Sequence, residues 1–383
     1  MKKKYDGIED IEMHYLDEPE KHLGSISVPI YQTSLFSRKT GNLGYQYTRI
    51  NNPTIEVPEK KIAKMEKGDG ALLFSSGMAA ITAALMHLVN QHSHIVYVTD
   101  VYMPTEYFIS TYLKEKFGVT STCFHANDYE AFEAAVTEKT DIIYLETCVS
   151  NIFSIPDVER ICNFAKKRGI KVIIDNTYAT PIFFNPLELG ADVVIHSCSK
   201  YIGGHSDIIG GVLISDHDTV EAIRHGERGL YGACIDPHQA WLVLRSLRTL
   251  DIRMERHMQN GITIARYLEQ SPYIEKVIYP ALESHPQHEY AESIFRGYPA
   301  LFCFVPAGGE EKAKLLFSHC EYPEKGPSWG GFETIMNSPG FSIDPIRREK
   351  TGILPGQIRI SIGLEDTDRL IEDFEQAFNK TYR

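Results

Sequence analysis

The sequence predicts an α/β protein built on a largely parallel sheet, from two observations. Short apolar runs follow one another from about residue 68, and longer amphipathic stretches such as 77–89, 105–117 and 157–168 separate them. This alternation is typical of strands that are buried on both faces and joined by crossover helices. The expected strands are ALLF (71–74), HIVYVTD (94–100), DIIYLE (141–146), IKVIID (170–175), ADVVI (191–195) and GGVLIS (210–215).

Three parts are expected along the chain. Residues 1–60 are rich in Tyr, Pro, Asn and Gly, which predicts an extended N-terminal arm. Residues 61–235 contain the six apolar runs and are expected to form the large domain. Residues 236–383 are expected to form a smaller C-terminal α/β domain, in which ALFCFV and QIRISIGLED are strand-like.

The C-terminal domain is expected to begin with one long helix. Asp236 is a predicted N-cap, and Pro237 follows at the first helical position. Apolar residues then recur at helical spacing until Ser271 and Pro272.

The composition limits the classes of partner. The formal net charge of −12 over 383 residues argues against nucleic acid or an anionic membrane as the main partner. No apolar run approaches the ~18 residues that span a bilayer, and the first residues lack the apolar core of a secretory signal. The seven cysteines are scattered without a C-x-x-C pair, so we expect reduced thiols in a cytoplasmic protein.

Polar residues follow the expected strands at their carboxyl ends, which is where open α/β sheets bind ligands. Each such residue alone is commonly only part of a turn or a helix cap, but together they indicate a binding site. They are Ser75-Ser76-Gly77-Met78, Tyr102, Glu146, Asp175-Asn176-Thr177 and the stretch HSCSKYIGGHSDIIGG around Lys200.

Two of these groups suit a phosphate. Gly77 and Met78 open an expected helix, where backbone N–H groups and the positive end of the helix dipole face an anion. Ser197 and Ser199 are placed to add hydroxyl donors to the same anion.

The remaining groups suit a flat ring that carries an aldehyde. Asp175 is suited to pair with a cationic ring nitrogen, Tyr102 to stack on the ring, and Lys200 to form an imine. A phosphate, a ring nitrogen, a ring face and an imine together describe pyridoxal 5′-phosphate.

Rival cofactors lack their motifs. The sequence has no G-x-G-x-x-G after an expected strand and no G-x-x-x-x-G-K-[ST], which dinucleotide and P-loop sites need. The fifteen histidines include no H-E-x-x-H, and QHSHI at 91–95 has no third ligand nearby, so no metal site is predicted.

Six motifs identify a family. They are YQYTRINNPT, FSSGMAAI, DNTYATP, HSCSKYIGGHSD, LRSLRTLDIRMERH and IRISIGLED. From about Ile26 to the C-terminus the chain resembles the pyridoxal-phosphate-dependent enzymes of cysteine and methionine metabolism. The resemblance implies the aspartate-aminotransferase-like fold, known as fold type I.

The resemblance also implies roles for individual residues. Lys200 would carry the cofactor and act as the base, Asp175 would hold the ring nitrogen protonated, and Tyr102 would stack on the ring. Gly77, Met78, Ser197 and Ser199 would bind the phosphate. Tyr47 and Arg49 would reach the phosphate of the neighbouring subunit, which implies a dimer with shared active sites, expected to pair again into a tetramer.

Substrate contacts are implied in the same way. Arg359 would bind the substrate α-carboxylate, for which a guanidinium is suited because it forms two parallel hydrogen bonds. Tyr47, Ser328 and Trp329 are expected to line the substrate cleft.

Three departures from the commoner family pattern resemble the bacterial cystathionine β-lyases. These are Ser150 in ETCVSN, Pro104 in YMPT, and Ser328-Trp329 in SWGG. They predict a carbon–sulfur β-lyase that cleaves L-cystathionine or similar thioether amino acids to a thiol, pyruvate and ammonia.

Two alternatives stay open at this point. No single residue excludes a relative that eliminates or replaces at Cγ. A relative that only binds or regulates is a further class, against which Lys200, Asp175, Tyr102 and Arg359 all argue.

Overall fold

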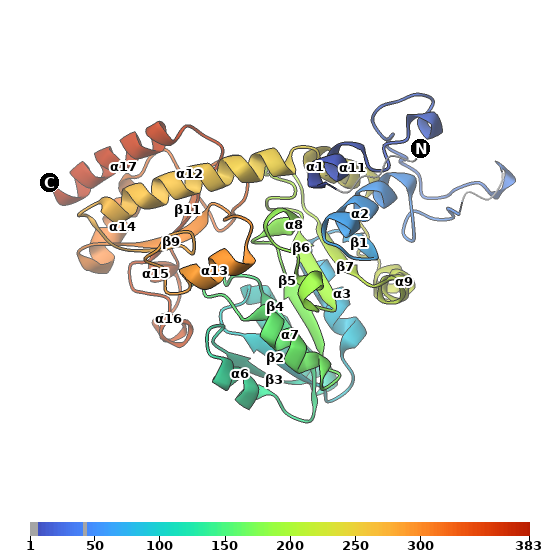
Figure 1. Cartoon of the computed structure of the whole chain (residues 1–383), viewed down its shortest axis with the longest axis horizontal. Coiled ribbons are helices and arrows are strands. Elements are labelled where there is room, and N and C mark those ends of the chain that lie inside the picture. The colour runs from blue at the N-terminus through green and yellow to red at the C-terminus, as the bar shows by residue number, and fades with distance from the viewer. Residues whose placement is uncertain (1–6, 41–43) are drawn as a thin grey trace.

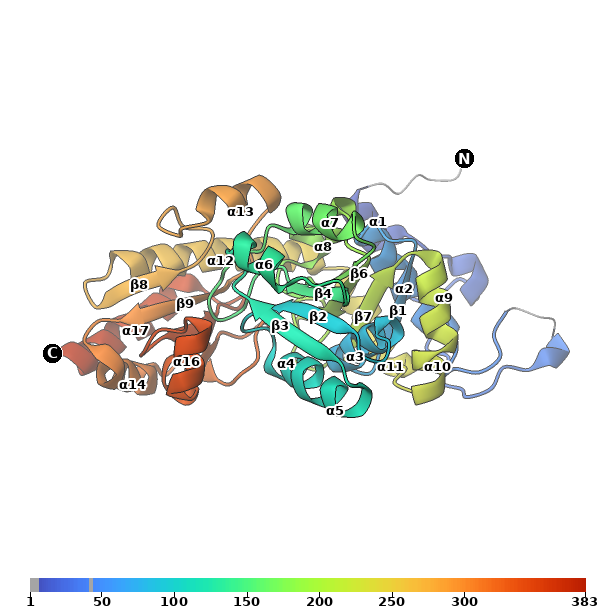
Figure 2. The ribbon, with the colours of Figure 1, turned by 90° about the horizontal axis from the view of Figure 1, so that it is seen from below.

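The computed structural model describes residues 7–40 and 44–383. Two β-sheets with their own helices lie side by side along the long axis of the molecule (Figures 1 and 2). The larger sheet has seven strands in the order β1-β7-β6-β5-β4-β2-β3. Its strands are β1 (Gly70–Phe74), β2 (His94–Val98), β3 (Thr120–Phe124), β4 (Thr140–Glu146), β5 (Lys171–Asp175), β6 (Val193–Ser197) and β7 (Gly211–Ser215).

The predicted α/β class is confirmed. All six apolar runs form strands, and neighbours from β3 to β6 pair in parallel, whereas β7 runs antiparallel to both β1 and β6. Strand β3 was not predicted, because its sequence TSTCF is largely polar. It lies at the edge of the sheet, where only some of its side chains are buried.

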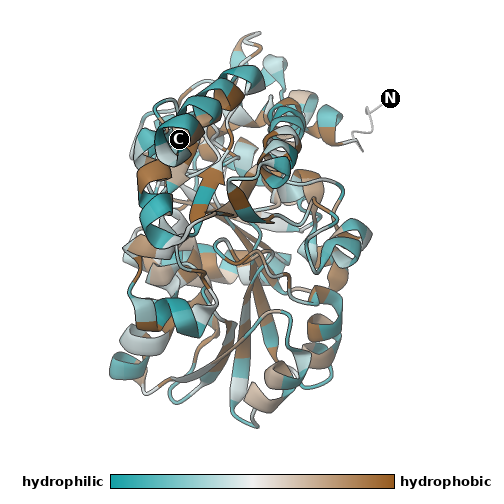
Figure 3. Ribbon diagram, turned by 90° about the vertical axis from the view of Figure 1, so that its left-hand side faces the viewer, coloured by the Kyte–Doolittle hydropathy of each residue, from teal (hydrophilic) through white to brown (hydrophobic). Residues whose placement is uncertain are grey.

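Helices cover the faces of the large sheet. Figure 3 shows hydrophobic strands between helices whose outward faces are hydrophilic, the arrangement expected for a doubly covered sheet. These helices are α2 (Pro53–Met65), α3 (Gly77–Leu88), α4 (Met103–Tyr107), α5 (Leu113–Phe117), α6 (Tyr129–Ala135), α7 (Val158–Lys166), α8 (Thr180–Phe183), α9 (His217–His225) and α10 (Glu227–Tyr231). A π-helical turn, Phe108–Tyr112, joins α4 to α5, so this predicted helix is not one regular α-helix.

The second sheet has five strands in the order β10-β11-β12-β9-β8. Its strands are β8 (Ile274–Ile278), β9 (Leu301–Pro306), β10 (Glu324–Lys325), β11 (Ile335–Asn337) and β12 (Ile358–Ser361). The helices of this half are α11 (Pro237–Leu247), α12 (Leu250–Gln270), α13 (His288–Ile294), α14 (Gly309–His319), α15 (Pro339–Ser342), α16 (Pro345–Thr351) and α17 (Thr367–Tyr382). Both predicted strands, ALFCFV and QIRISIGLED, are confirmed as β9 and β12.

The prediction of one long helix after Asp236 is wrong, because α11 and α12 are separate. Asp236 does cap α11, since its side chain accepts hydrogen bonds from the next backbone N–H groups. The break after Leu247 exposes the carbonyl of Ser246, which accepts from the guanidinium of Arg253 at 3.0 Å. That buried arginine also donates to the carbonyl of Tyr201 at 2.6 Å, so a tertiary contact accompanies the break. Helix α12 then runs from the large sheet to the small one (Figure 1).

The N-terminal segment is not wholly irregular, because it contains α1 (Ile8–His14) and short 3₁₀ turns. Between α1 and α2 the chain leaves the body of the protein and projects beyond α9 (Figures 1 and 2). Residues 1–6 and 41–43 of the predicted arm lie outside the described residues. The boundaries at 60/61 and 235/236 stay predictions.

Three further findings concern the described residues. No helix among them is both long and apolar enough to cross a membrane. They contain no group of three or more His, Cys, Asp or Glu side chains that could hold a metal ion. Each of the seven cysteines is a free thiol, and five are buried.

Candidate active site

A cavity of about 290 Å³ lies where the carboxyl ends of β4, β5 and β6 face the small sheet. The large sheet contributes the residues that follow its strands, and the small sheet contributes β12 and the loop before β11. The lining residues are Ser76, Gly77, Met78, Ile81, Tyr102, Glu146, Cys148, Ser150, Asp175, Thr177, Tyr178, Ser197, Ser199, Lys200, Ile209, Pro327, Trp329 and Arg359.

The N-terminus of α3 forms one wall of this cavity. The side chain of Ser76 caps the helix by accepting from the amide of Ala79 at 3.1 Å, so the cap does not use the amides of Gly77 and Met78. Glycine favours the close packing at position 77, because a Cβ there would lie 3.0 Å from Cβ of Ser197, which is tighter than an ordinary contact. The helix end therefore packs directly against β6, with its positive end at the cavity.

Two carboxyl groups meet at neighbouring strand ends. Glu146 and Asp175 are register partners on β4 and β5. Burial raises the pKa of Asp175, although the hydrogen bond from the amide of Thr177, at 2.9 Å, opposes the rise. Burial and the neighbouring Asp175 together raise the pKa of Glu146 well above its usual value. A cation near this pair would favour the charged carboxylates, as a protonated ring nitrogen beside Asp175 would do.

Lys200 lies in the turn after β6 and points across the cavity. Its Nζ donates to Oγ of Ser328 at 2.8 Å and lies 5.3 Å from the ring centre of Trp329. Burial, then the nearby cation of Arg359, lowers the pKa of Lys200 to about 8, against the opposing effect of Asp175. A much larger fraction of this amine is neutral near pH 7 than of an exposed lysine, which suits a nucleophile or a base.

Arg359 is buried on β12, where it pairs with Cys303 of β9 and Asn337 of β11. Its guanidinium donates to the carbonyl of Pro327 at 2.7 Å and to Oδ1 of Asn151 at 3.4 Å. Burial lowers its pKa from the usual value, but an arginine retains its charge at neutral pH. Because both partners are neutral oxygens, the cation is suited to bind an anionic substrate group.

Tyr102 stands at the mouth of the cavity, immediately before α4. Its side chain is 54% exposed, and its amide donates to Oε1 of Glu146 at 2.6 Å. Ser199 lies opposite, where its hydroxyl accepts from the amide of Gly210 at 3.2 Å.

The structure brings together most of the residues predicted from the sequence, but not all of them. Those that line the cavity are Gly77, Met78, Tyr102, Asp175, Ser197, Ser199, Lys200, Trp329 and Arg359. Ser328 reaches the site through its hydrogen bond with Lys200. Neither Tyr47 nor Arg49 is a lining residue of the described chain: Tyr47 lines a separate surface hollow, and the guanidinium of Arg49 donates to the carbonyl of Gly229.

Three contributors had no role in the sequence prediction. Glu146 was placed at a strand end, but its contact with Tyr102 was not foreseen. Thr177 was likewise seen only as part of DNT, although its hydroxyl accepts from the amide of Ser197 at 2.8 Å and so joins β5 to β6. Asn151 accepts a hydrogen bond from Arg359. It directly follows ETCVS, and its position just after a predicted strand end could have marked it as a site residue.

Comparison with known proteins identifies the family. The model of the family described as Cys/Met metabolism PLP-dependent enzyme matches residues 10–379. The chain belongs to this family. It is 37% identical over 364 residues to a cystathionine γ-lyase of Bacillus subtilis (strain 168), with 94% of this chain and 95% of the relative covered. A cystathionine β-lyase of Coxiella burnetii is 35% identical over 373 residues, with 95% and 96% covered.

Solved structures agree with this family and with its fold. The crystal structure of cystathionine γ-lyase from Lactobacillus plantarum complexed with L-serine matches with a TM-score of 0.92 and 34% identity, covering 98% of this chain and 99% of that one. The fold is therefore the fold type I predicted from the motifs, and the cofactor of the family is pyridoxal phosphate.

The chemistry of the cavity fits this cofactor. The α3 amides with Ser197 and Ser199 offer donors to a phosphate, and the partly buried Asp175 offers a carboxylate to a cationic ring nitrogen. Lys200 offers an amine whose pKa is lowered to about 8, as imine formation with an aldehyde requires.

Proposed function

We propose that the chain is a carbon–sulfur β-lyase that cleaves L-cystathionine or similar thioether amino acids to a thiol, pyruvate and ammonia. The observation that carries this proposal is the position of the departures that resemble β-lyases. Ser150 and Trp329 line the cavity, and Ser328 accepts the hydrogen bond of Lys200. Pro104 lies in the first turn of α4, two residues after Tyr102.

The residues of the cavity divide the work of such a reaction. Arg359 holds the substrate carboxylate, and Lys200 removes the proton from Cα. The bound cofactor supplies an electron sink for the negative charge left at Cα. Asp175 stabilises the positive charge of the ring nitrogen. Lys200 or Tyr102 then gives a proton to the sulfur as the Cβ–S bond breaks.

Elimination at Cγ is the second candidate, and it is supported by the names of the relatives. The chain is 37% identical to a γ-lyase and 35% identical to a β-lyase, so overall similarity does not choose between them. A γ-elimination needs a second deprotonation, at Cβ, which Lys200 is also placed to perform.

The keto-acid product separates the two candidates. The purified holoenzyme is incubated with L-cystathionine, and the products are resolved by chromatography. Pyruvate with homocysteine is expected, whereas 2-oxobutyrate with cysteine would contradict the proposal. Steady-state kinetics with cystathionine, cystine, lanthionine and djenkolate then rank the substrates by the group beyond the sulfur.

We also propose that the enzyme is a homo-oligomer in which Tyr47 and Arg49 complete the active site of the partner subunit. Two observations support this. Both residues lie outside the cavity of their own chain, and Tyr47 is 44% exposed on an arm that projects from the body of the protein. An exposed arm of this kind gains stability by packing on another subunit. A tetramer of two such dimers is proposed on the family resemblance.

Complementation tests the shared site. Lys200→Ala and Arg49→Ala are each expected to be inactive and are refolded together. If Arg49 acts on the partner, a mixed dimer has one native site and one site with both lesions, so activity returns towards half. Mixed dimers without activity, verified by differential tags, would place Arg49 in its own site.

A further inference from the structure

The arm residues Tyr47 and Arg49 lie in a tight turn just before α2. The amide of Ile50 donates to the carbonyl of Tyr47 at 2.9 Å, and the amide of Asn51 donates to the same oxygen at 3.2 Å. Asn52 then caps α2 by accepting from the amide of Thr54 at 2.9 Å. The position of this turn therefore decides where Tyr47 and Arg49 are presented.

Helix α10 holds the turn at two points. The guanidinium of Arg228 donates through Nη2 to the carbonyl of Ile50 at 2.6 Å, and Arg49 donates to the carbonyl of Gly229. A Cβ at position 229 would lie 2.7 Å from the carbonyl oxygen of Arg224 and 3.3 Å from Cδ1 of Ile50. Glycine thus allows α10 to approach the turn closely.

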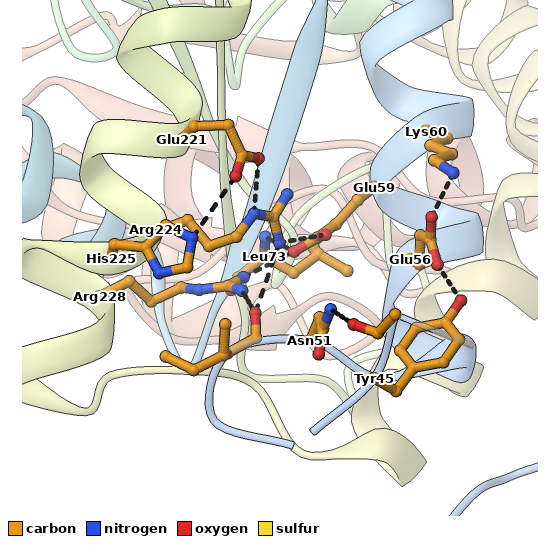
Figure 4. A network of polar contacts seen from close by, with 12 residues as sticks. Tyr45, Asn51, Glu56, Glu59, Lys60, Leu73, Glu221, Arg224, His225 and Arg228 are labelled. Carbon is orange, nitrogen blue, oxygen red and sulfur yellow. Dashed lines mark hydrogen bonds and ion pairs between the residues drawn. The ribbon is translucent and has the colours of Figure 1, made fainter. Parts of the chain in front are cut away.

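Arg228 is itself held by contacts with α2 and β1 (Figure 4). It is 1% exposed, and its Nη1 donates to Oε1 of Glu59 on α2 at 2.7 Å and to the carbonyl of Leu73 on β1 at 3.2 Å. Glu59 in turn accepts from the amide of Leu73 at 2.8 Å. Arg224 lies 3.5 Å from both Ile50 O and Glu59, a longer contact than that of Arg228.

We propose that Arg228 is a positioning residue that sets the arm of its own chain for use in the partner's active site. Its planar fork joins α2 and β1, which belong to the body of the protein, to the irregular turn that presents Tyr47 and Arg49. A buried ion pair is by itself weak evidence of a contribution to stability, whereas fixing one backbone register is a role that such a pair can fill. The inference rests on the shared site proposed above.

The test uses Arg228→Met/Glu59→Gln, since Arg228→Met alone would leave the buried carboxylate of Glu59 with only its longer contact to Arg224, at 3.5 Å. The glutamine oxygen still accepts from the amide of Leu73, which protects the packing of α2 on β1. The control is Arg348→Met/Glu310→Gln, which removes a more exposed Arg–Glu pair, 3.0 Å apart, that joins α16 to α14 away from the arm.

The first readout is cofactor affinity, measured by titrating the apo-proteins with pyridoxal phosphate and following absorbance. Loss of arm contacts to the phosphate is expected to raise Kd roughly tenfold, the effect of one hydrogen bond to a charged group. The control pair is expected to leave Kd unchanged. An unchanged Kd in Arg228→Met/Glu59→Gln would overturn the proposal.

The second readout shows which subunit's site depends on Arg228. Arg228→Met/Glu59→Gln is refolded with Lys200→Ala and assayed at a cofactor concentration near the wild-type Kd. Each mixed dimer then contains one site with a native lysine and a native arm, so activity should return towards half that of wild type. No recovery, with recovery in the Arg49→Ala mixture, would show that Arg228 serves its own site and overturn this inference alone. Failure of the Arg49→Ala mixture would overturn the shared site and this inference together.

Discussion

The strand-end cavity and the arm are held in place by different interactions. The cavity residues follow strands such as β6, whose apolar side chains are fully buried, and α3 packs against β6 through Gly77. In the arm, 68% of Leu35 and 44% of Tyr47 are exposed. Hydrogen bonds between α10 and the turn at Arg49 and Ile50 fix the end of the arm that adjoins α2. Burial of apolar surface thus forms the cavity within one chain. The arm is instead held by a few hydrogen bonds, and in the proposed shared site a partner subunit supplies the surface on which it packs.

The largest effect is expected at the centre of the cavity. Lys200→Ala removes the amine that we propose binds the cofactor and acts as the base. Keto-acid formation should therefore fall by at least roughly a thousandfold, since a general base alone contributes about 10²–10⁴. Cofactor should still bind through its phosphate, measured by equilibrium dialysis. Turnover near the wild-type rate would show that the cavity is not the active site.

A smaller loss of activity is expected from a substitution on β12, the strand of the small sheet that lines the cavity. Arg359→Leu deletes the cation that we propose binds the substrate carboxylate, so kcat/KM should fall roughly a hundredfold, mostly through KM. An unchanged far-UV circular dichroism spectrum should show that the variant keeps the overall fold. An unchanged kcat/KM would assign the carboxylate to another group.

The pH dependence of cofactor uptake reports on Lys200 directly. Only its neutral amine attacks an aldehyde, and its pKa is lowered to about 8 by burial and by Arg359. The rate at which apo-protein recombines with pyridoxal phosphate should rise roughly tenfold for each pH unit up to about 8, then level off. In Arg359→Leu a neighbouring cation is lost, so the pKa of Lys200 should rise and the plateau should move to higher pH. A plateau that stays at the same pH would contradict this electrostatic coupling.

The smallest change in cofactor affinity is expected when a helix cap is removed, and two caps can be compared, of which only one also contacts the arm. Asn52→Ala and Asp236→Ala each remove an N-cap. Loss of the exposed cap Asp236 should lower the free energy of unfolding by about 1 kcal/mol in a denaturant titration, and loss of the buried Asn52 should lower it further. Asn52 also donates to the carbonyl of Tyr31 and to Oγ1 of Thr48, at 2.9 and 3.0 Å. Only Asn52→Ala should therefore also raise the Kd of the cofactor, by about two- to threefold. Equal Kd values in the two variants would show that the arm does not depend on its cap.

Local patterns in the sequence were enough to predict most of the large sheet. Six apolar runs became strands because each is a continuous buried segment, whose signal does not depend on distant residues. Edge strand β3 was not predicted, because its sequence TSTCF is largely polar and only its last residue is fully buried. The break between α11 and α12 was not predicted, because no Gly or Pro marks it in the sequence. The contacts of Arg253 with Tyr201 and Ser246 that accompany the break form only in the folded chain.

The sequence by itself was enough to predict which residues share the candidate cofactor site, because residues at the carboxyl ends of parallel strands must meet at one edge of the sheet. That rule predicts from the sequence that Gly77, Asp175 and Lys200 lie close together. Only the tertiary structure decided how charge is arranged there. The pKa of Lys200 depends on its burial and on Arg359, which is 159 residues away in the chain and reaches the site through the packing of one sheet beside the other. The hydrogen bond from Arg228 to the carbonyl of Ile50 likewise joins segments far apart in sequence, and no local pattern predicts such a contact.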